Sequence, residues 1–158
     1  ITRRILPPPA SSKIYELTEW GSELEPVFRA LAQWGARAPT PPRSDRLSPD
    51  SVMLGLRTFF VAPEEDPWSA TYDVHLGREH YRLRVLDGRL TELTRTAPDS
   101  PPDATLTCTD HMTMNALAGQ VETLDALMER GDVAISGDAD AVRRLINAVQ
   151  KSQPTPAA

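Results

Sequence analysis

The stretch that decides the fold is "HYRLRVLDGRLTELT", residues 80–94. Tyr81, Leu83 and Val85 alternate with polar side chains, which is the period of a strand that buries one face. Asp87 and Gly88 follow and supply the positive-φ pair that a two-residue hairpin turn requires. The stretch therefore predicts a β-hairpin that belongs to a sheet with one buried face.

The segments around this hairpin extend the prediction to an α+β domain. Further strands are expected at "ATYDVHL" (70–76), "ATLTCT" (104–109) and "VAIS" (133–136). Helices are expected at "PDSVMLGLRTFFVA" (49–62), "HMTMNALAG" (111–119), "VETLDALMERG" (121–131) and "DADAVRRLINAVQ" (138–150). Ser48, Asp110 and Asp138 precede three of these helices as candidate N-caps. We expect an antiparallel sheet packed by helices.

The beginning of the chain, "ITRRILPPPASSKIYELTEWG" (1–21), predicts a separate, smaller unit. Two strand-like arms flank a Pro-rich loop and form a two-stranded ribbon. A helix follows and ends at Gly35 as its C-cap. Either this helix begins at Thr18 and kinks at Pro26, or it begins afresh at Ser22, and both alternatives remain open. The expected organisation is a first domain (1–38), a Pro-rich linker (39–48), the α+β domain (49–150) and a disordered tail (151–158).

Composition indicates a globular, intracellular protein. Of its 158 residues, 40% are hydrophobic and 25% are charged, and the net charge of -5 argues against a chain that is basic throughout. No apolar run approaches the roughly 20 residues that span a bilayer. The single cysteine, Cys108, excludes an internal disulfide framework and fits a reducing compartment. We expect a cytoplasmic protein without a membrane partner.

Catalytic and metal-binding patterns are not found. The three histidines, His75, His80 and His111, lack metal-ligand spacing, and five residues of extended chain are expected to place His75 and His80 on opposite faces. Cys108 lies in an apolar strand and is interpreted as a core residue. We therefore expect no enzyme activity, no cofactor and no metal.

Two family resemblances add expectations that periodicity does not supply. Residues 1–37 resemble the wing and following helix of HxlR-type winged helix-turn-helix regulators, through "YELTE" (15–19), Gly21 and the pair Trp34 and Gly35. From "LSPDSVMLGLRTFF" (47–60) to Ala148 the chain resembles a sterol-carrier-protein-type domain, through "DATLTCTDHMTMNALAGQ" and "GDVAISGDADAVRRL". The implied architecture is a winged-helix remnant followed by a sterol-carrier-like α+β domain. The recognition helix that precedes the wing in that family is not in the sequence, so we expect a piece of a longer protein.

These resemblances imply a DNA-binding transcriptional regulator whose second domain binds a small apolar effector or supports assembly. The alternative is a lipid-binding or lipid-carrier module without a DNA-binding role. The DNA contacts implied on the wing are Arg3, Arg4, Ser11, Ser12 and Lys13. Operator, effector and sign of regulation are not predicted.

The apolar residues of both units have two possible roles. In the first helix a stripe fills the local core or forms a homodimer interface, which is the interpretation we favour: Leu24, Val27, Phe28, Leu31 and Trp34. In the second domain an apolar set either lines a ligand pocket or fills the core: Leu56, Phe59, Phe60, Tyr72, Tyr81, Met112, Met114, Leu117, Leu127 and Met128.

Overall fold

The computed structural model describes residues 1–5, 13–35, 47–95 and 100–149, and the chain divides into two compact units, residues 1–35 and 36–158. In the first unit β1 (Thr2–Ile5) and β2 (Lys13–Glu16) pair antiparallel, which confirms the predicted ribbon. Arg4 and Glu16 form an exposed ion pair of 3.3 Å across it. The predicted linker residues 39–46, the tail and the loop residues Ser11 and Ser12 lie outside the described residues.

Two short helices follow the ribbon, α1 (Glu19–Ser22) and α2 (Glu25–Gly35). The Thr18 hydroxyl accepts a hydrogen bond from the backbone N–H of Gly21 (3.1 Å) and caps α1. Pro26 lies in the first turn of α2, where a missing backbone N–H leaves no hydrogen bond unmade. A helix thus begins after Thr18, as in the first alternative, but it ends at Ser22, and the second helix begins at Glu25 rather than at Ser22.

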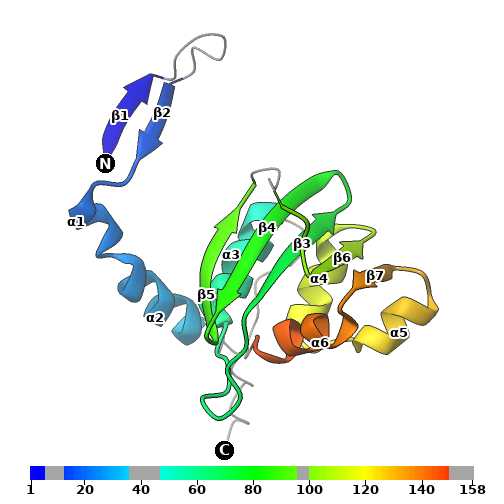
Figure 1. Cartoon of the computed structure of the whole chain (residues 1–158). Helices are drawn as coiled ribbons and strands as arrows, with labels where there is room; N and C mark the ends of the chain where they lie inside the picture. Colours follow the sequence, from blue (N-terminus) through cyan, green and yellow to red (C-terminus); the bar gives the residue numbers. More distant parts are fainter. Residues whose placement is uncertain (6–12, 36–46, 96–99, 150–158) are drawn as a thin grey trace, which may run out of the picture. The chain divides into compact units, whose positions relative to one another are not determined.

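The second unit is built on a five-stranded sheet in the order β5-β4-β3-β6-β7 (Figure 1). Its strands are β3 (Ala70–Leu76), β4 (Glu79–Leu86), β5 (Arg89–Thr94), β6 (Ala104–Cys108) and β7 (Val133–Gly137). β3 and β6 are parallel, whereas the other neighbours are antiparallel. The sheet is therefore mixed, and the predicted all-antiparallel sheet is wrong. In the sheet, β4 and β3 lie between β5 and β6, so the chain must cross over two strands to connect β5 to β6. Hydrophobic periodicity carries no signal for such a crossover.

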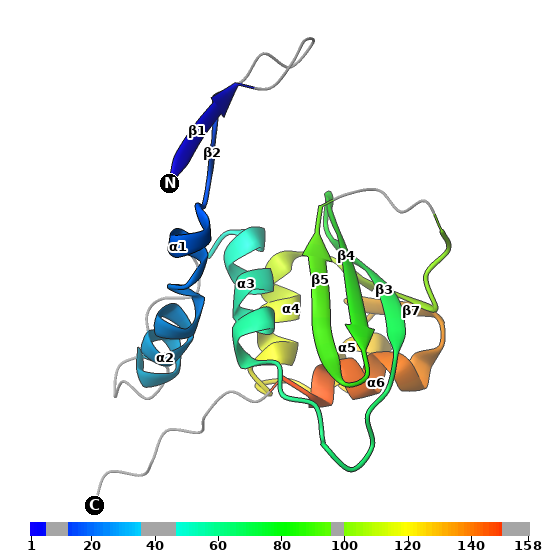
Figure 2. The ribbon, with the colours of Figure 1, turned by 60° about the vertical axis from the view of Figure 1, so that its left-hand side comes forward.

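The helices of this unit gather on one side of the sheet (Figures 1 and 2). They are α3 (Pro49–Phe59), α4 (His111–Ala118), α5 (Leu124–Glu129) and α6 (Ala139–Asn147). Ser48, Asp110 and Asp138 each accept a backbone N–H from the residue three positions later, so the predicted N-caps are confirmed. Burial alternates along β3 because one strand face packs against the helices and the other does not. The predicted α+β class is confirmed.

Two contacts join the elements of this core. The Trp68 Nε1–H donates to the Tyr72 hydroxyl (2.8 Å), which in turn donates to the Ala141 carbonyl (3.0 Å) and links β3 to α6. Beyond α3, Phe60 forms a β-bridge with Val149 after α6. Burial raises the pKa of the Tyr72 hydroxyl, so this group stays a neutral donor. The sheet and helices are thereby held in one framework.

The sheet face away from the helices is polar. It carries Asp73 and His75 on β3, opposite Arg82 and His80 on β4. His75 and His80 are direct cross-strand partners, so the expectation that they point to opposite faces is wrong. The turn at Gly77 (φ +62°) reverses the chain between them, and residues paired across strands share a face.

The predicted hairpin turn is confirmed, because Asp87 (φ +48°) and Gly88 (φ +73°) both adopt positive φ. No helix among residues 1–5, 13–35, 47–95 and 100–149 is long and apolar enough to cross a membrane.

Candidate ligand-binding groove

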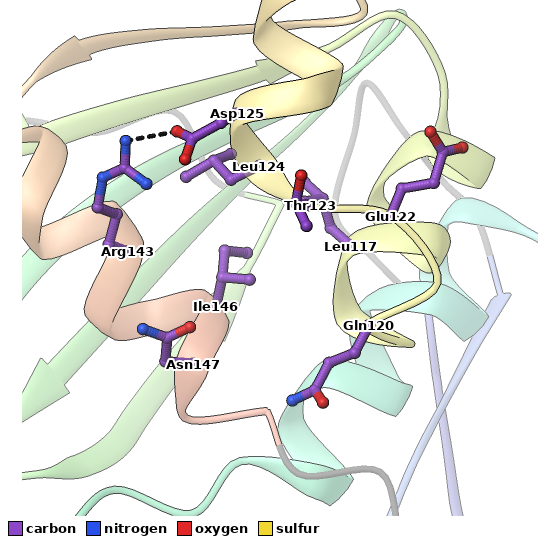
Figure 3. Close-up of a pocket in the computed structure, with 9 residues that line it drawn as sticks. All are labelled: Leu117, Gln120, Glu122, Thr123, Leu124, Asp125, Arg143, Ile146 and Asn147. Atoms are coloured by element: carbon purple, nitrogen blue, oxygen red, sulfur yellow. Dashed lines mark hydrogen bonds and ion pairs between the residues drawn. The ribbon is translucent and has the colours of Figure 1, made fainter.

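A hollow of about 270 Å³ lies where α4, α5 and α6 approach one another (Figure 3). Leu117 near the end of α4, Leu124 at the start of α5 and Ile146 on α6 form its floor. All three side chains are buried, with exposed fractions of 1%, 7% and 7%. The floor is apolar because each helix turns its hydrophobic stripe toward the sheet, and the three stripes meet there.

An ion pair lies at one end of the groove. Arg143 on α6 donates to the Asp125 carboxylate on α5 (2.6 Å), as Figure 3 shows. The hydrogen bond from Arg143 and its positive charge lower the pKa of the Asp125 carboxyl, so the pair stays ionised at neutral pH. Both side chains are largely exposed, so the pair orients the rim more than it stabilises the fold.

The other end of the groove carries two amides, Gln120 after α4 and Asn147 at the end of α6 (Figure 3). Gln120 has φ +53°, a left-handed conformation that ends the helix, and the Val121 N–H donates to the Ala116 carbonyl (3.0 Å) in the pattern of a helix C-cap. Amide groups both donate and accept hydrogen bonds, so this end suits a neutral polar group.

A second hollow of about 320 Å³ differs in chemistry. Its lining includes Asp103, Asp138 and Asp140 together with Arg144. Asp138 is engaged as the N-cap of α6, and Asp103 accepts the Thr71 N–H (2.7 Å). Because the lining is charged, and Asp103 and Asp138 already have structural partners, this hollow is a weaker candidate for an apolar ligand.

The predicted pocket residues are divided between the core and this groove. Leu117 lines the groove. Seven others are buried in the core between sheet and helices: Leu56, Phe59, Phe60, Tyr72, Tyr81, Met114 and Leu127. Met112 is half-buried, and Met128 is 39% exposed. A pocket lined by the whole predicted set stays a prediction.

Sequence reasoning missed Leu124 and Ile146 as groove residues. Both residues lie on the buried faces of their helices, α5 and α6. The available signal was the amphipathic pattern of both helices, but the pattern does not tell which neighbouring helix each stripe meets.

The residues predicted on the first unit are exposed where they are described. Arg3 and Arg4 lie on the exposed strand β1, and Lys13 begins β2. In the predicted stripe, which runs from just before α2 to its end, the exposed fractions are 49% for Leu24, 60% for Val27, 65% for Phe28, 57% for Leu31 and 69% for Trp34. The homodimer assigned to this stripe stays a prediction.

The only cysteine of the chain is not a nucleophile. Cys108 is 1% exposed, and burial raises the pKa of its thiol to about 12. A thiol rather than a thiolate is therefore present at neutral pH. The interpretation of Cys108 as a core residue is confirmed.

Comparison with known families identifies the second unit. The family model described as "Alkyl sulfatase C-terminal" matches residues 68–155. Since this match spans more than half of the chain, the protein belongs to the alkyl sulfatase C-terminal family. Comparison with curated proteins finds no match.

Solved structures with a similar fold include the stereoselective inverting sec-alkylsulfatase Pisa1 from Pseudomonas sp., at 17% identity and a TM-score of 0.61. That match covers 75% of this chain and 20% of the sulfatase chain, so the protein spans about a fifth of that enzyme's length. Sterol carrier protein 2 like 2 from Aedes aegypti matches at 16% identity over 63% of this chain and 94% of its own, with a TM-score of 0.47. Sterol carrier protein-2 like-3 from the same organism matches at 22% identity over 64% and 95%, with a TM-score of 0.48.

The family match corrects the predicted DNA-binding regulator. The matching family is that of an alkyl sulfatase domain, and the sulfatase reported above shares the fold. The HxlR resemblance covers residues 1–37, whose described part forms a ribbon and two helices, a local arrangement that does not determine function. The DNA contacts predicted for Arg3, Arg4, Ser11, Ser12 and Lys13 are withdrawn with it.

Proposed function

We propose that the second unit is a binding domain for a short, neutral alkyl chain, which lies in the groove between α4, α5 and α6. The observation that carries this proposal is the convergence of Leu117, Leu124 and Ile146 on the floor of an open hollow. An alkyl chain seated there removes its own surface from water, at about 25 cal/mol per Å².

The size of the groove supports a small ligand. Its volume of about 270 Å³ lies just below the roughly 300–1,000 Å³ of ordinary small-molecule sites. A short alkyl chain therefore fits better than a sterol-sized molecule.

Charge around the groove supports a neutral head group. Asp125 and Glu122 oppose the single arginine of the lining, and Arg143 already donates to Asp125. Glu122 is in turn paired with Arg130. An anionic head would have to break the Arg143–Asp125 pair, whereas a hydroxyl group can bond to Gln120 or Asn147 without breaking any ion pair.

The similarity to a sulfatase supports the alkyl chain of the proposed ligand, whereas the neutral head group rests on the charges around the groove. The sec-alkylsulfatase that shares the fold is named for alkyl sulfates, compounds with an alkyl chain. Binding rather than catalysis is the proposed role of this unit, which corresponds to the alternative of a lipid-binding module.

The test is a thermal melt of the whole chain with 1-octanol or octyl sulfate. Octanol at 100 times its dissociation constant should stabilise the fold by about 2.7 kcal/mol through mass action. Octyl sulfate should give a smaller shift at equal concentration because of its charge. Asn147→Trp, from an exposed rim position on α6, should fill the groove and abolish the octanol shift.

Arg144→Trp is the matched control, because Arg144 is exposed on the same helix but lines the other hollow. It should keep the full octanol shift. A wild-type chain without any octanol shift, or an Asn147→Trp chain that retains it, would refute the groove as the ligand site. A larger shift with octyl sulfate would refute the neutral head group.

A further inference from the structure

The polar face of the sheet carries a pair of stacked histidines. His75 on β3 and His80 on β4 are cross-strand partners, and their ring centroids lie 4.0 Å apart with an interplanar angle of 23°. His75 is half-buried and His80 is exposed, so solvent and ions reach the pair. We propose that His75 and His80 form a two-histidine site for a late divalent transition-metal ion, and that Cu²⁺ binds there most tightly.

Hairpin geometry brings the two imidazoles together. Leu76 and Glu79 flank the two-residue turn and form the first pair of the hairpin. In such a hairpin that pair is hydrogen-bonded, so the next pair, His75 and His80, is of the non-hydrogen-bonded kind, whose side chains are closest. The backbone therefore holds both ligands in register without a metal ion.

The ring separation fits a shared metal ion. Metal–nitrogen bonds of about 2.0–2.1 Å place two ligating nitrogens roughly 3 to 4 Å apart. Rings stacked at 4.0 Å need only rotate about their side-chain bonds to direct one nitrogen each toward a common ion. The strands do not have to move.

Neighbouring groups determine the kind of ion. Asp73, two residues before His75 on the same face, is held by Arg82 (2.7 Å), and Arg82 also donates to the Ser100 carbonyl (2.9 Å). The Asp73 carboxylate is therefore already engaged in an ion pair with Arg82. Among the residues that the structure describes, no three His, Cys, Asp or Glu side chains are grouped as metal ligands. Two imidazoles with water in the other positions suit Cu²⁺, Ni²⁺ or Zn²⁺ and not Mg²⁺, and Cu²⁺ leads this series.

This site is independent of the proposed alkyl-chain groove. The histidines occupy the sheet face away from the helices, whereas the groove lies among the helices. Failure of either proposal leaves the other unaffected.

The experiment is a titration of the whole chain with Cu²⁺ at neutral pH. Nuclear magnetic resonance monitors the ring resonances of the histidines during the titration. Substoichiometric Cu²⁺ should broaden the His75 and His80 resonances before that of His111, and binding should saturate near one ion per chain. Mg²⁺ should have no effect. His75→Ala and His80→Gln should each weaken Cu²⁺ binding at least roughly tenfold, because changes even in outer-shell groups cost that much.

His111→Ala is the matched control, because His111 begins α4 and belongs to no such pair. It should bind Cu²⁺ as the wild type does. Broadening centred on His111, equal affinity in the His75 and His80 variants, or no saturable binding by the wild type would each overturn the proposal. The readout on the wild-type resonances holds even if a variant fails to fold.

Discussion

Gly137 is the residue whose backbone most clearly requires glycine. It has φ +79°, and a Cβ atom there would lie 2.4 Å from the Asp103 carbonyl oxygen. The contact is with backbone, and the same carbonyl accepts the Asp138 N–H (2.9 Å), so the strand end cannot shift without losing that bond. Close packing of β7 against the start of β6 thus depends on one missing methyl group.

Gly137→Ala should therefore destabilise the second unit by about 3 kcal/mol or more, through the clash and the left-handed backbone together. Gly55→Ala is the control, because Gly55 is inside α3 with no atom within 4 Å of an added Cβ. It should stabilise the fold by roughly 0.5–1 kcal/mol. Urea unfolding of both variants measures the difference, and an unchanged midpoint for Gly137→Ala would contradict the packing described.

Asp110 is a second residue with a measurable local role. It caps α4 by accepting the Thr113 N–H (2.8 Å), and this hydrogen bond is the main cause that lowers its pKa below the ordinary 3.8. A lowered folded pKa means that the stabilisation is complete above the unfolded pKa of about 3.9 and is lost as pH falls through the folded value.

Asp110→Asn should flatten this dependence, because asparagine caps helices about as well as aspartate but does not titrate. Asp110→Ala should instead lose about 1 kcal/mol at pH 7. Unfolding free energies between pH 6 and pH 3 test both variants. An acid-induced loss of the same size in wild type and Asp110→Asn would exclude Asp110 as a contributor.

At the scale of elements, Tyr72 joins strand β3 to helix α6. Its hydroxyl accepts from Trp68 and donates to Ala141 in the buried core. Tyr72→Phe would leave the Trp68 Nε1–H and the Ala141 carbonyl without this partner, which should cost about 1–3 kcal/mol. Tyr15→Phe, at a position 73% exposed, should leave the unfolding midpoint unchanged. Equal midpoints for the two variants in urea would show that the link contributes nothing.

Elements with local signals were predictable from sequence. The N-caps at Ser48 and Asp110 and the turn at Asp87 and Gly88 each depend on residues next to one another in the chain, and all are confirmed. The parallel pairing of β3 with β6 depends on a crossover between distant segments, and no local pattern encodes it.

The candidate sites were less predictable for the same reason. Leu124 and Ile146 meet only when α5 and α6 pack together, so neither sequence segment shows a groove. The His75–His80 pair could have been found from sequence. An extended chain would place residues five positions apart on opposite faces, but the turn at Gly77 pairs His75 with His80 across a hairpin and so puts both rings on one face.

At the scale of the whole molecule, the exposed apolar stripe of the first unit requires an explanation. Its side chains, Leu31 among them, remain about half exposed or more. Such a stripe on one chain is commonly covered in an assembly, and a two-fold homodimer is the assembly we predict.

Leu31→Asp should then give monomers, because an unpaired carboxylate at an apolar interface costs several kcal/mol. Leu54→Asp is the control, since Leu54 is 62% exposed on α3 in the other unit. It should leave the sedimentation coefficient of the wild type unchanged. Monomeric wild-type chain at micromolar concentration would contradict the predicted dimer.

The most direct test of the proposed function is a map of where an alkyl chain binds. The whole chain, labelled for nuclear magnetic resonance, is titrated with 1-octanol while the methyl resonances of its leucines and isoleucines are followed. The groove predicts the largest shifts at Leu117, Leu124 and Ile146, and no shift at Leu54, an exposed residue of α3 that does not line the groove. Shifts centred on other side chains, or none at saturating octanol, would contradict the proposed binding function.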